Sequence, residues 1–318
     1  MLSGISITCF AASYAVALAL EASRLWFRSG VRGAVMLCFA IAGLAAQGMF
    51  LAYRAATASD TPLSSAFDWY LLAAWILAAV YVYLAVCHQR TAVGLFILPL
   101  VLALIGMAQA FASQRPFPQS RASQVWGTLH GVFILLGVVA VLVGFVQGLM
   151  FLLQANRLKR KLPPARGFYF PSLESLERAS GRSIVFAVWM LGIGFISGIV
   201  LNAVNTQSQL DHIPWTDPVV WSSGILLAWM VAAATFSAVY RPARQGRKVA
   251  YLTLANFAFL LLTLTIRLLL PSEHRSQSAA NGQPDAAAAR TVQVIPRDMA
   301  SPIASVAAGG WTSSEGQA

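Results

Sequence analysis

Long apolar stretches separated by short polar segments dominate the chain. A transmembrane helix needs about 20 consecutive, mostly apolar residues to cross a hydrocarbon core of about 30 Å. Eight stretches meet this requirement: 5–25, 33–53, 69–88, 93–113, 127–154, 184–205, 219–240 and 250–270. Because a segment in lipid must satisfy its own backbone hydrogen bonds, we predict that all of them are helices. The pattern therefore predicts an all-α, polytopic membrane bundle over residues 1–275.

The composition supports a membrane protein. Of the 318 residues, 58% are hydrophobic and only 10% are charged, whereas soluble domains carry about 25% charged residues. The first apolar stretch has neither a basic leader nor a small-residue cleavage site, so we expect it to persist as a helix. Cys9, Cys38 and Cys87 form no CxxC motif, which argues against a thioredoxin-like redox motif and a zinc knuckle.

The basic residues are unevenly distributed between the loops. Those of the odd-numbered loops and their edges are Arg24, Arg28, Arg32, Arg90, Arg157, Lys159, Arg160, Lys161, Arg166, Arg178, Arg182, Arg241, Arg244, Arg247 and Lys248. The even-numbered loops have only Arg54, Arg115 and Arg121. Cytoplasmic loops are enriched in Lys and Arg, so we predict an N-out, C-out topology. The net charge of +11 then reflects membrane topology, and nucleic acid is not an expected partner.

Two segments outside the spans have distinctive patterns. In residues 171–178, Leu173 and Leu176 share one face of a short amphipathic helix, which we predict lies on the inner leaflet. The tail, residues 276–318, is rich in Ala, Ser, Gln, Gly and Pro, a composition typical of disorder. We therefore predict a disordered, extracytoplasmic tail.

GxxxG motifs occur in the fifth and sixth stretches, as Gly144–Gly148 and Gly194–Gly198. Small residues at this spacing let helix backbones approach closely. We therefore predict that these two sequential spans pack on each other. No internal repeat is visible, which argues against a transporter built from inverted repeats.

A short polar segment with two tryptophans, Trp215-Thr216-Asp217-Pro218-Val219-Val220-Trp221, falls in the sixth loop. The predicted topology places it on the outer side. Tryptophan faces stack on flat ligands, and their N–H groups reach polar edges. The segment therefore suggests a platform for a flat, partly charged ligand. The alternative is that Trp215, Trp221 and Trp126 are aromatic-belt anchors at the membrane interface.

Three of the four histidines, His130, His212 and His274, map to the same predicted outer side, whereas His88 lies at an inner helix end. Neutral imidazole is a common axial ligand of haem iron, and histidines on different helices can approach a porphyrin from both faces. A closed zinc site usually needs four N, S or O ligands and suits this set less well. The alternative is a hydrated histidine at the interface, which we favour for His212 because its loop is polar.

Arg267 lies about one turn inside the outer end of the eighth stretch. A charge at membrane depth costs several kcal/mol unless it is paired or hydrated. Arg267 would pair with a haem propionate or with Asp217. The alternative is that its side chain extends to the outer headgroups.

Several of these segments resemble one family. Residues 214–221, with Leu226-Leu227-Ala228-Trp229 downstream, resemble the tryptophan-rich signature of the cytochrome c assembly protein family, which includes CcsA, ResC, CcmC and HemX-like membrane proteins. Residues 62–68 resemble the segment before its third span, and residues 126–131 resemble its histidine-bearing helix start.

The resemblance covers most of residues 1–275 and is closest to the short HemX-like branch. The family's usual Lys-Glu pair after Asp-Pro is replaced here by Val219-Val220, and the platform has fewer tryptophans than the cytochrome c synthetase type.

The resemblance implies site residues and a ligand. It implies that His130 and His274 are the axial ligands of haem iron, and that Trp215, Asp217 and Trp221 hold the porphyrin. The haem would be b-type and transiently bound, on the outer face of a bacterial inner (plasma) membrane. The implied partners are other cytochrome c assembly proteins, apocytochrome c and the lipid bilayer.

The resemblance implies haem handling in cytochrome c assembly, as a component of a haem lyase system rather than as an enzyme by itself. Two alternatives remain open. One is a membrane regulator of haem biosynthesis that acts on the level of glutamyl-tRNA reductase. The other is a small-solute transporter, against which the scarcity of charged residues at mid-membrane depth argues when transport is ion-coupled.

Overall fold

The described part of the chain folds into eight helices, as the apolar pattern predicts. This computed structural model describes residues 6–23, 30–57, 65–87, 91–112, 121–161, 171–207, 217–239 and 247–269. The helices are α1 (Ile7–Ser23), α2 (Gly30–Thr57), α3 (Ala66–Cys87), α4 (Gly94–Phe111), α5 (Arg121–Lys159), α6 (Leu173–Gln207), α7 (Pro218–Val239) and α8 (Arg247–Leu269).

The lengths of these helices confirm a multi-pass membrane protein. Seven of the described helices are long and apolar enough to span a bilayer, and α1 is an apolar helix of 17 residues. With 39 and 35 residues, α5 and α6 are roughly 50–60 Å long at a rise of about 1.5 Å per residue. Both therefore extend beyond a hydrocarbon core of about 30 Å.

Residues 171–178 do not form a separate interfacial helix, contrary to the prediction. From Leu173 onward they are the first turns of α6. Ser172 caps this helix, since its Oγ accepts a hydrogen bond from the Ser175 amide at 3.3 Å. Leu176 is only 4% exposed and belongs to the main apolar core. No proline occurs between Leu173 and Pro214, so the helix continues into the span.

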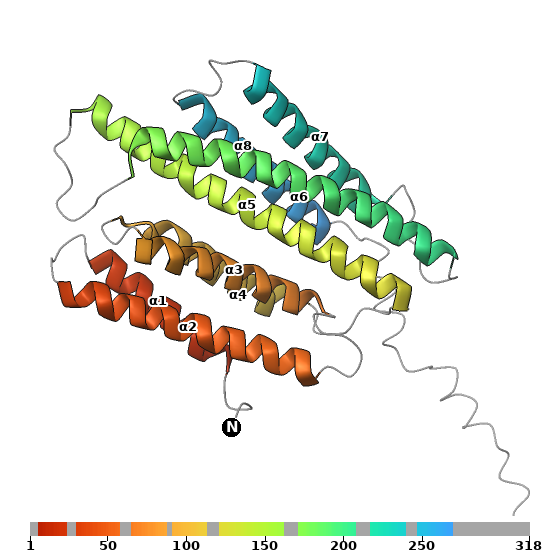
Figure 1. The fold of residues 1–318 in the computed structure, drawn as a ribbon, viewed down its shortest axis with the longest axis horizontal. Helices are drawn as coiled ribbons and strands as arrows, with labels where there is room; N and C mark the ends of the chain where they lie inside the picture. The colour runs from red at the N-terminus through yellow and green to blue at the C-terminus, as the bar shows by residue number, and fades with distance from the viewer. Residues whose placement is uncertain are drawn as a thin grey trace, which may run out of the picture. The chain divides into compact units, whose positions relative to one another are not determined.

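The helices form two neighbouring groups that meet at α5 (Figure 1). In the first group, α1 contacts α2 and α4, and α3 contacts α2 and α4. In the second, α5 and α6 share the most extensive contact among the described helices, and α8 contacts α5, α6 and α7. Because α5 also contacts α3 and α4, it joins the two groups.

Interhelical hydrogen bonds fix the first group. The fully buried Gln47 of α2 accepts a hydrogen bond from the Tyr14 hydroxyl of α1 at 2.9 Å and donates one to the Leu71 carbonyl of α3 at 2.9 Å. The Trp75 indole of α3 donates to the Leu44 carbonyl at 3.0 Å. Such bonds hold helices together where lipid supplies no hydrophobic driving force between them.

The two GxxxG motifs have different uses. As predicted, α5 and α6 pack on each other, and a Cβ at Gly194 of α6 would lie 3.1 Å from the Ile134 backbone nitrogen of α5. Gly148, however, faces α8, where a Cβ would collide with the Thr253 hydroxyl. The GxxxG spacing correctly predicted that another helix packs closely on these glycines, but it does not specify which helix that is.

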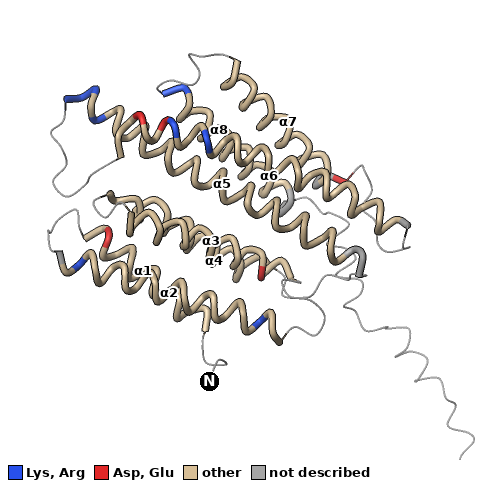
Figure 2. The backbone as a smooth tube through the Cα atoms, viewed as in Figure 1, with Lys and Arg blue, Asp and Glu red and all other residues tan. Residues whose placement is uncertain are grey.

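Most of the described Lys and Arg residues lie at one end of the bundle (Figure 2). This end carries the helix termini that flank the odd-numbered loops. Enrichment of basic residues is typical of the cytoplasmic side, and the N-out, C-out topology itself stays a prediction. The tail, residues 276–318, lies outside the described residues, so its predicted disorder stays a prediction as well.

Candidate haem-binding site

His130 lies in the N-terminal third of α5, at the end of the bundle opposite the basic end. Trp126 precedes it by four residues, so the two side chains share one face of the helix. Trp126 is 36% exposed, and His130 is half-buried against α6. An aromatic ring open to the surroundings therefore lies one turn outward from the imidazole.

A backbone hydrogen bond orients the His130 ring. Its Nδ1 lies 2.7 Å from the Gly194 carbonyl oxygen of α6. A carbonyl oxygen only accepts, so Nδ1 must carry the proton, and in the neutral ring the lone pair is then on Nε2. Histidines that bind metals are commonly held in this way, with the second ring N–H donated to a carbonyl. The donor chemistry and the tautomer therefore fit an axial ligand of haem iron.

Gly198 makes room for this ring. A Cβ at this position of α6 would lie 2.8 Å from both Cε1 and Nδ1 of His130. Carbon atoms do not approach so closely, so any larger residue would displace the imidazole. The second glycine of the GxxxG motif therefore serves the histidine as well as the helix contact.

Replacing Gly198 by alanine should weaken haem binding by on the order of tenfold, because the displaced ring loses its bond to Gly194. Removing groups that orient a metal ligand typically costs about 10–100-fold in affinity. Titration of the purified variant with haem, followed by Soret absorbance, measures the change. Gly192→Ala is the matched control, because a Cβ there meets nothing within 4 Å. Equal affinity of Gly198→Ala and wild type would contradict this account of the ring.

Trp69 of α3 contacts α5 beside His130. A Cβ at Gly131 would lie 2.6 Å from Cη2 and Cζ2 of the Trp69 indole. The indole therefore packs directly on the α5 backbone at the residue that follows His130. This contact brings the first turn of α3 next to the histidine.

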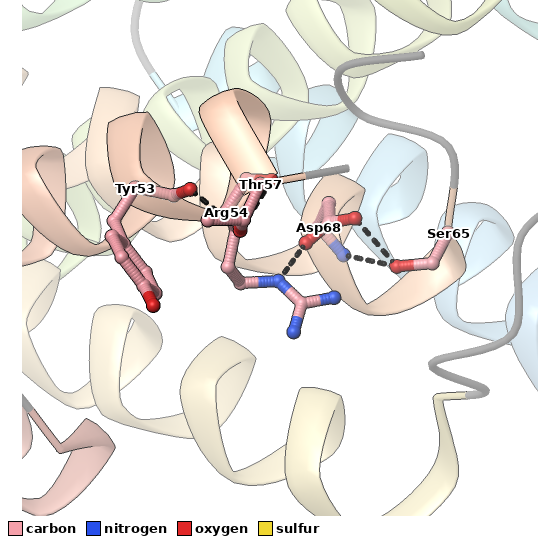
Figure 3. Close-up of polar contacts among 5 residues, drawn as sticks. All are labelled: Tyr53, Arg54, Thr57, Ser65 and Asp68. Carbon is pink, nitrogen blue, oxygen red and sulfur yellow. Dashed lines mark hydrogen bonds and ion pairs between the residues drawn. The ribbon is translucent and has the colours of Figure 1, made fainter. Parts of the chain in front are cut away.

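The first turn of α3 also carries a buried carboxylate with two partners (Figure 3). Asp68 Oδ1 accepts a hydrogen bond from Arg54 Nε of α2 at 2.6 Å, and its Oδ2 accepts one from the Ser65 hydroxyl at 2.6 Å. The Arg54 guanidinium carbon also lies 5.0 Å from the centre of the Phe67 ring. The arginine is in the last turn of α2 and the aspartate in the first turn of α3, so both charges match the helix dipoles.

Asp217 has a structural role in the tryptophan-bearing segment. It directly precedes α7, and its carbonyl accepts hydrogen bonds from the Val220 and Trp221 amides at 3.0 and 3.3 Å. Asp is favoured at this capping position, and Pro at the next residue, Pro218, has the fixed φ of a first helical turn. Asp217 is only 4% exposed. The Asp-Pro pair therefore sets where the helix that carries Trp221 begins.

Trp221 is 64% exposed and borders an open apolar groove of about 280 Å³ between α7 and α8. Opposite it, α8 contributes apolar residues such as Phe259, Leu262 and Ile266. A groove with one large aromatic ring at its edge suits a flat apolar ligand.

Helix α6 places His130 and Trp221 at about the same depth. The carbonyl that holds His130 belongs to Gly194, and the next residue, Phe195, lies 3.7 Å from where a Cβ of Gly224 in α7 would be. Gly224 is three residues from Trp221, which is about one helical turn. The two predicted site residues thus flank the same stretch of α6.

The remaining predicted site residues are not among the residues, or the side chains, that the structure describes. Trp215, His212 and His274 are outside the described residues, and Arg267 is in the last turn of α8 with its side chain outside them. The roles predicted for His274, Trp215 and Arg267 therefore stay predictions.

Sequence reasoning missed Arg54, Asp68 and Trp69. A signal was present, because Asp68 is the single carboxylate in the first turn of α3, and Arg54 lies in the last turn of the preceding helix. A charged residue at the start of an apolar span is costly unless it is paired, so a partner across that loop was a reasonable expectation.

Comparison with known proteins identifies the family. The model of the family described as "Cytochrome C assembly protein" matches residues 63–273, about two thirds of the chain. A curated relative, the "Cytochrome c biogenesis protein CcsA" of Guillardia theta, is 22% identical over 77% of this chain and 84% of its own length. No solved structure matches the chain. The family match includes α3 to α8 with His130, Asp217 and Trp221, and the chain therefore belongs to the cytochrome c assembly protein family.

Proposed function

We propose that this membrane protein binds haem at the end of the bundle that carries His130 and presents it on the outer face of the membrane for cytochrome c assembly. Membership of the family supports a role in cytochrome c biogenesis. The observation that carries the proposal is the orientation of His130 by the Gly194 carbonyl at 2.7 Å. A histidine held in this tautomer has its lone pair on Nε2, as an axial iron ligand requires.

The surroundings of His130 suit a porphyrin. Trp126 and Trp69 supply aromatic surface on either side of the α5 backbone. Trp221 lies across α6 from this histidine, at the edge of the groove between α7 and α8. Aromatic side chains contribute large apolar contact areas and stack on flat rings. Haem in this proposal is the cargo, and the protein holds and orients it.

The proposal includes residues and partners that the family resemblance implies. His274 would be the second axial ligand, with Trp215 and Asp217 at the porphyrin and Arg267 at a propionate. The haem would be b-type and transiently held. Other cytochrome c assembly proteins and apocytochrome c would be the partners, in a bacterial inner membrane.

Absorbance of the purified full-length protein tests the proposal. Protein expressed with adequate haem should show a Soret band with a stoichiometry near one haem per chain. A preparation with no Soret band, before or after titration with haem, would overturn haem binding. Deleting the gene tests the pathway: loss of holo-cytochromes c at normal total haem supports assembly, whereas altered glutamyl-tRNA reductase levels support regulation of haem biosynthesis instead.

A further inference from the structure

We propose that Arg54, held in place by Asp68, binds a carboxylate of the porphyrin. This inference rests on the proposed haem site at His130 and extends it to α2 and α3. It assigns a ligand-binding role to a charged pair that otherwise serves only to join two helices.

The geometry of the pair leaves binding capacity on the guanidinium. Asp68 contacts Arg54 at Nε alone, at 2.6 Å, instead of through two parallel hydrogen bonds. Among the described residues, no hydrogen bond or ion pair involves the terminal nitrogens Nη1 and Nη2. In Figure 3 the dashed line from the guanidinium to Asp68 starts at Nε, and none starts at the two terminal nitrogens. The Arg54 side chain is 29% exposed, so a ligand can reach them.

The fork formed by Nη1 and Nη2 matches one ligand chemistry well. A planar guanidinium offers two parallel N–H groups to the two oxygens of a carboxylate, and charge-assisted bonds of this kind are about twice as strong as neutral ones. Asp68 and the Phe67 ring already fix the guanidinium. Little conformational freedom is therefore lost when the ligand binds.

The position points to the porphyrin as the source of the carboxylate. Trp69 follows Asp68 directly in α3, and its indole packs on Gly131, the residue after His130. Figure 1 shows the end of α2 and the start of α5 at the same end of the bundle. An iron ligand, an aromatic surface and a cationic fork thus follow one another along the α5–α3–α2 contact, and haem carries propionates at its edge.

A comparison of haem with its dimethyl ester tests this inference on the full-length protein. The ester keeps the iron and the ring but lacks the carboxylate charges. Wild-type protein should bind iron protoporphyrin IX on the order of tenfold more tightly than the ester, because a hydrogen bond to a charged group is lost. Arg54→Gln should prefer the acid over the ester much less than wild type does, and any preference that remains belongs to the other proposed propionate partner, Arg267. Arg178→Gln is the matched control, since Arg178 pairs with Glu174 on an exposed face of α6, and it should discriminate as wild type does.

A double variant separates an effect on ligand binding from an effect on stability. Arg54→Gln alone leaves a buried carboxylate without its cation, which destabilises a protein strongly. The pair Arg54→Gln with Asp68→Asn removes both charges and retains polar side chains of similar size, and it should show the same reduced preference for the acid. Equal binding of acid and ester by the wild type would overturn this inference while leaving haem binding intact. Failure to bind either porphyrin would overturn the proposed function itself.

An anionic lipid is the competing source of an anion at this depth. The titrations should therefore be repeated in mixed micelles with and without phosphatidylglycerol. Discrimination that persists in both supports the porphyrin carboxylate. Discrimination by the wild type that disappears when phosphatidylglycerol is added assigns the fork to lipid phosphate and overturns the inference.

Discussion

A His130→Ala variant should lose haem affinity by at least on the order of a hundredfold, while the helical bundle stays intact. Groups that merely orient a metal ligand cost about 10–100-fold when removed, so the ligand itself should cost no less. The truncation leaves a recess against Gly194 and Gly198 of α6. Haem titrations of the detergent-solubilised variant, followed by Soret absorbance and helical circular dichroism, measure both effects.

Added imidazole provides a rescue for the same variant. Because the recess is shaped by the lost ring and offers the Gly194 carbonyl as acceptor, free imidazole should restore the haem spectrum of the variant. His88→Ala is the matched control, since the predicted topology places His88 on the inner side of the membrane and His130 on the outer side. If His130→Ala retained haem with the wild-type spectrum and affinity, His130 would not be a ligand.

A Gly148→Ala variant should unfold more readily than wild type, by about 1–3 kcal/mol, the usual cost of overpacking a well-packed core. The added Cβ would collide with the Thr253 hydroxyl and lie 3.1 Å from the Ala250 carbonyl oxygen, so α8 must move away from α5. The stacked rings of Phe145 and Phe257, with centroids 3.9 Å apart, lie in the same interface and would be disturbed. SDS-induced unfolding in mixed micelles gives the free-energy difference.

The cause of this destabilisation can be checked by a second substitution. Thr253→Ala in the Gly148→Ala background removes the colliding side chain, so most of the lost stability should return. Gly106→Ala in α4 is the control, because a Cβ there meets nothing within 4 Å and alanine favours helix over glycine. No recovery in the double variant would mean that the α5–α8 contact is not as close as described.

The apolar pattern predicted the elements of the fold because lipid imposes length and hydropathy on every span. It could not predict that residues 171–178 are part of α6, because an amphipathic turn at an interface and the first turn of a longer helix have the same periodicity. In the structure, the Ser172 cap and the burial of Leu176 distinguish the two. The helix continues because no proline interrupts it.

The sequence singled out candidate site residues, but it did not indicate their contacts. His130 and Trp221 stood out by residue type and by their position near helix starts. The carbonyl that orients His130 belongs to Gly194, 64 residues later, and no local pattern links the two. Arg54 and Asp68 are closer in sequence, but their pairing depends on the relative orientation of α2 and α3. The positions of charged residues along the chain do not specify that orientation.

The bond between His130 and the Gly194 carbonyl also sets an order of events during synthesis. Chains fold from the N-terminus as they emerge, and the hydrogen bonds of Gln47 are complete once α1, α2 and α3 are inserted. His130 then enters the membrane with α5, but its acceptor arrives only with α6. The nascent protein can therefore complete its α1–α3 contacts first, whereas the ring of His130, the proposed haem ligand, is oriented only after α6 has entered the bilayer.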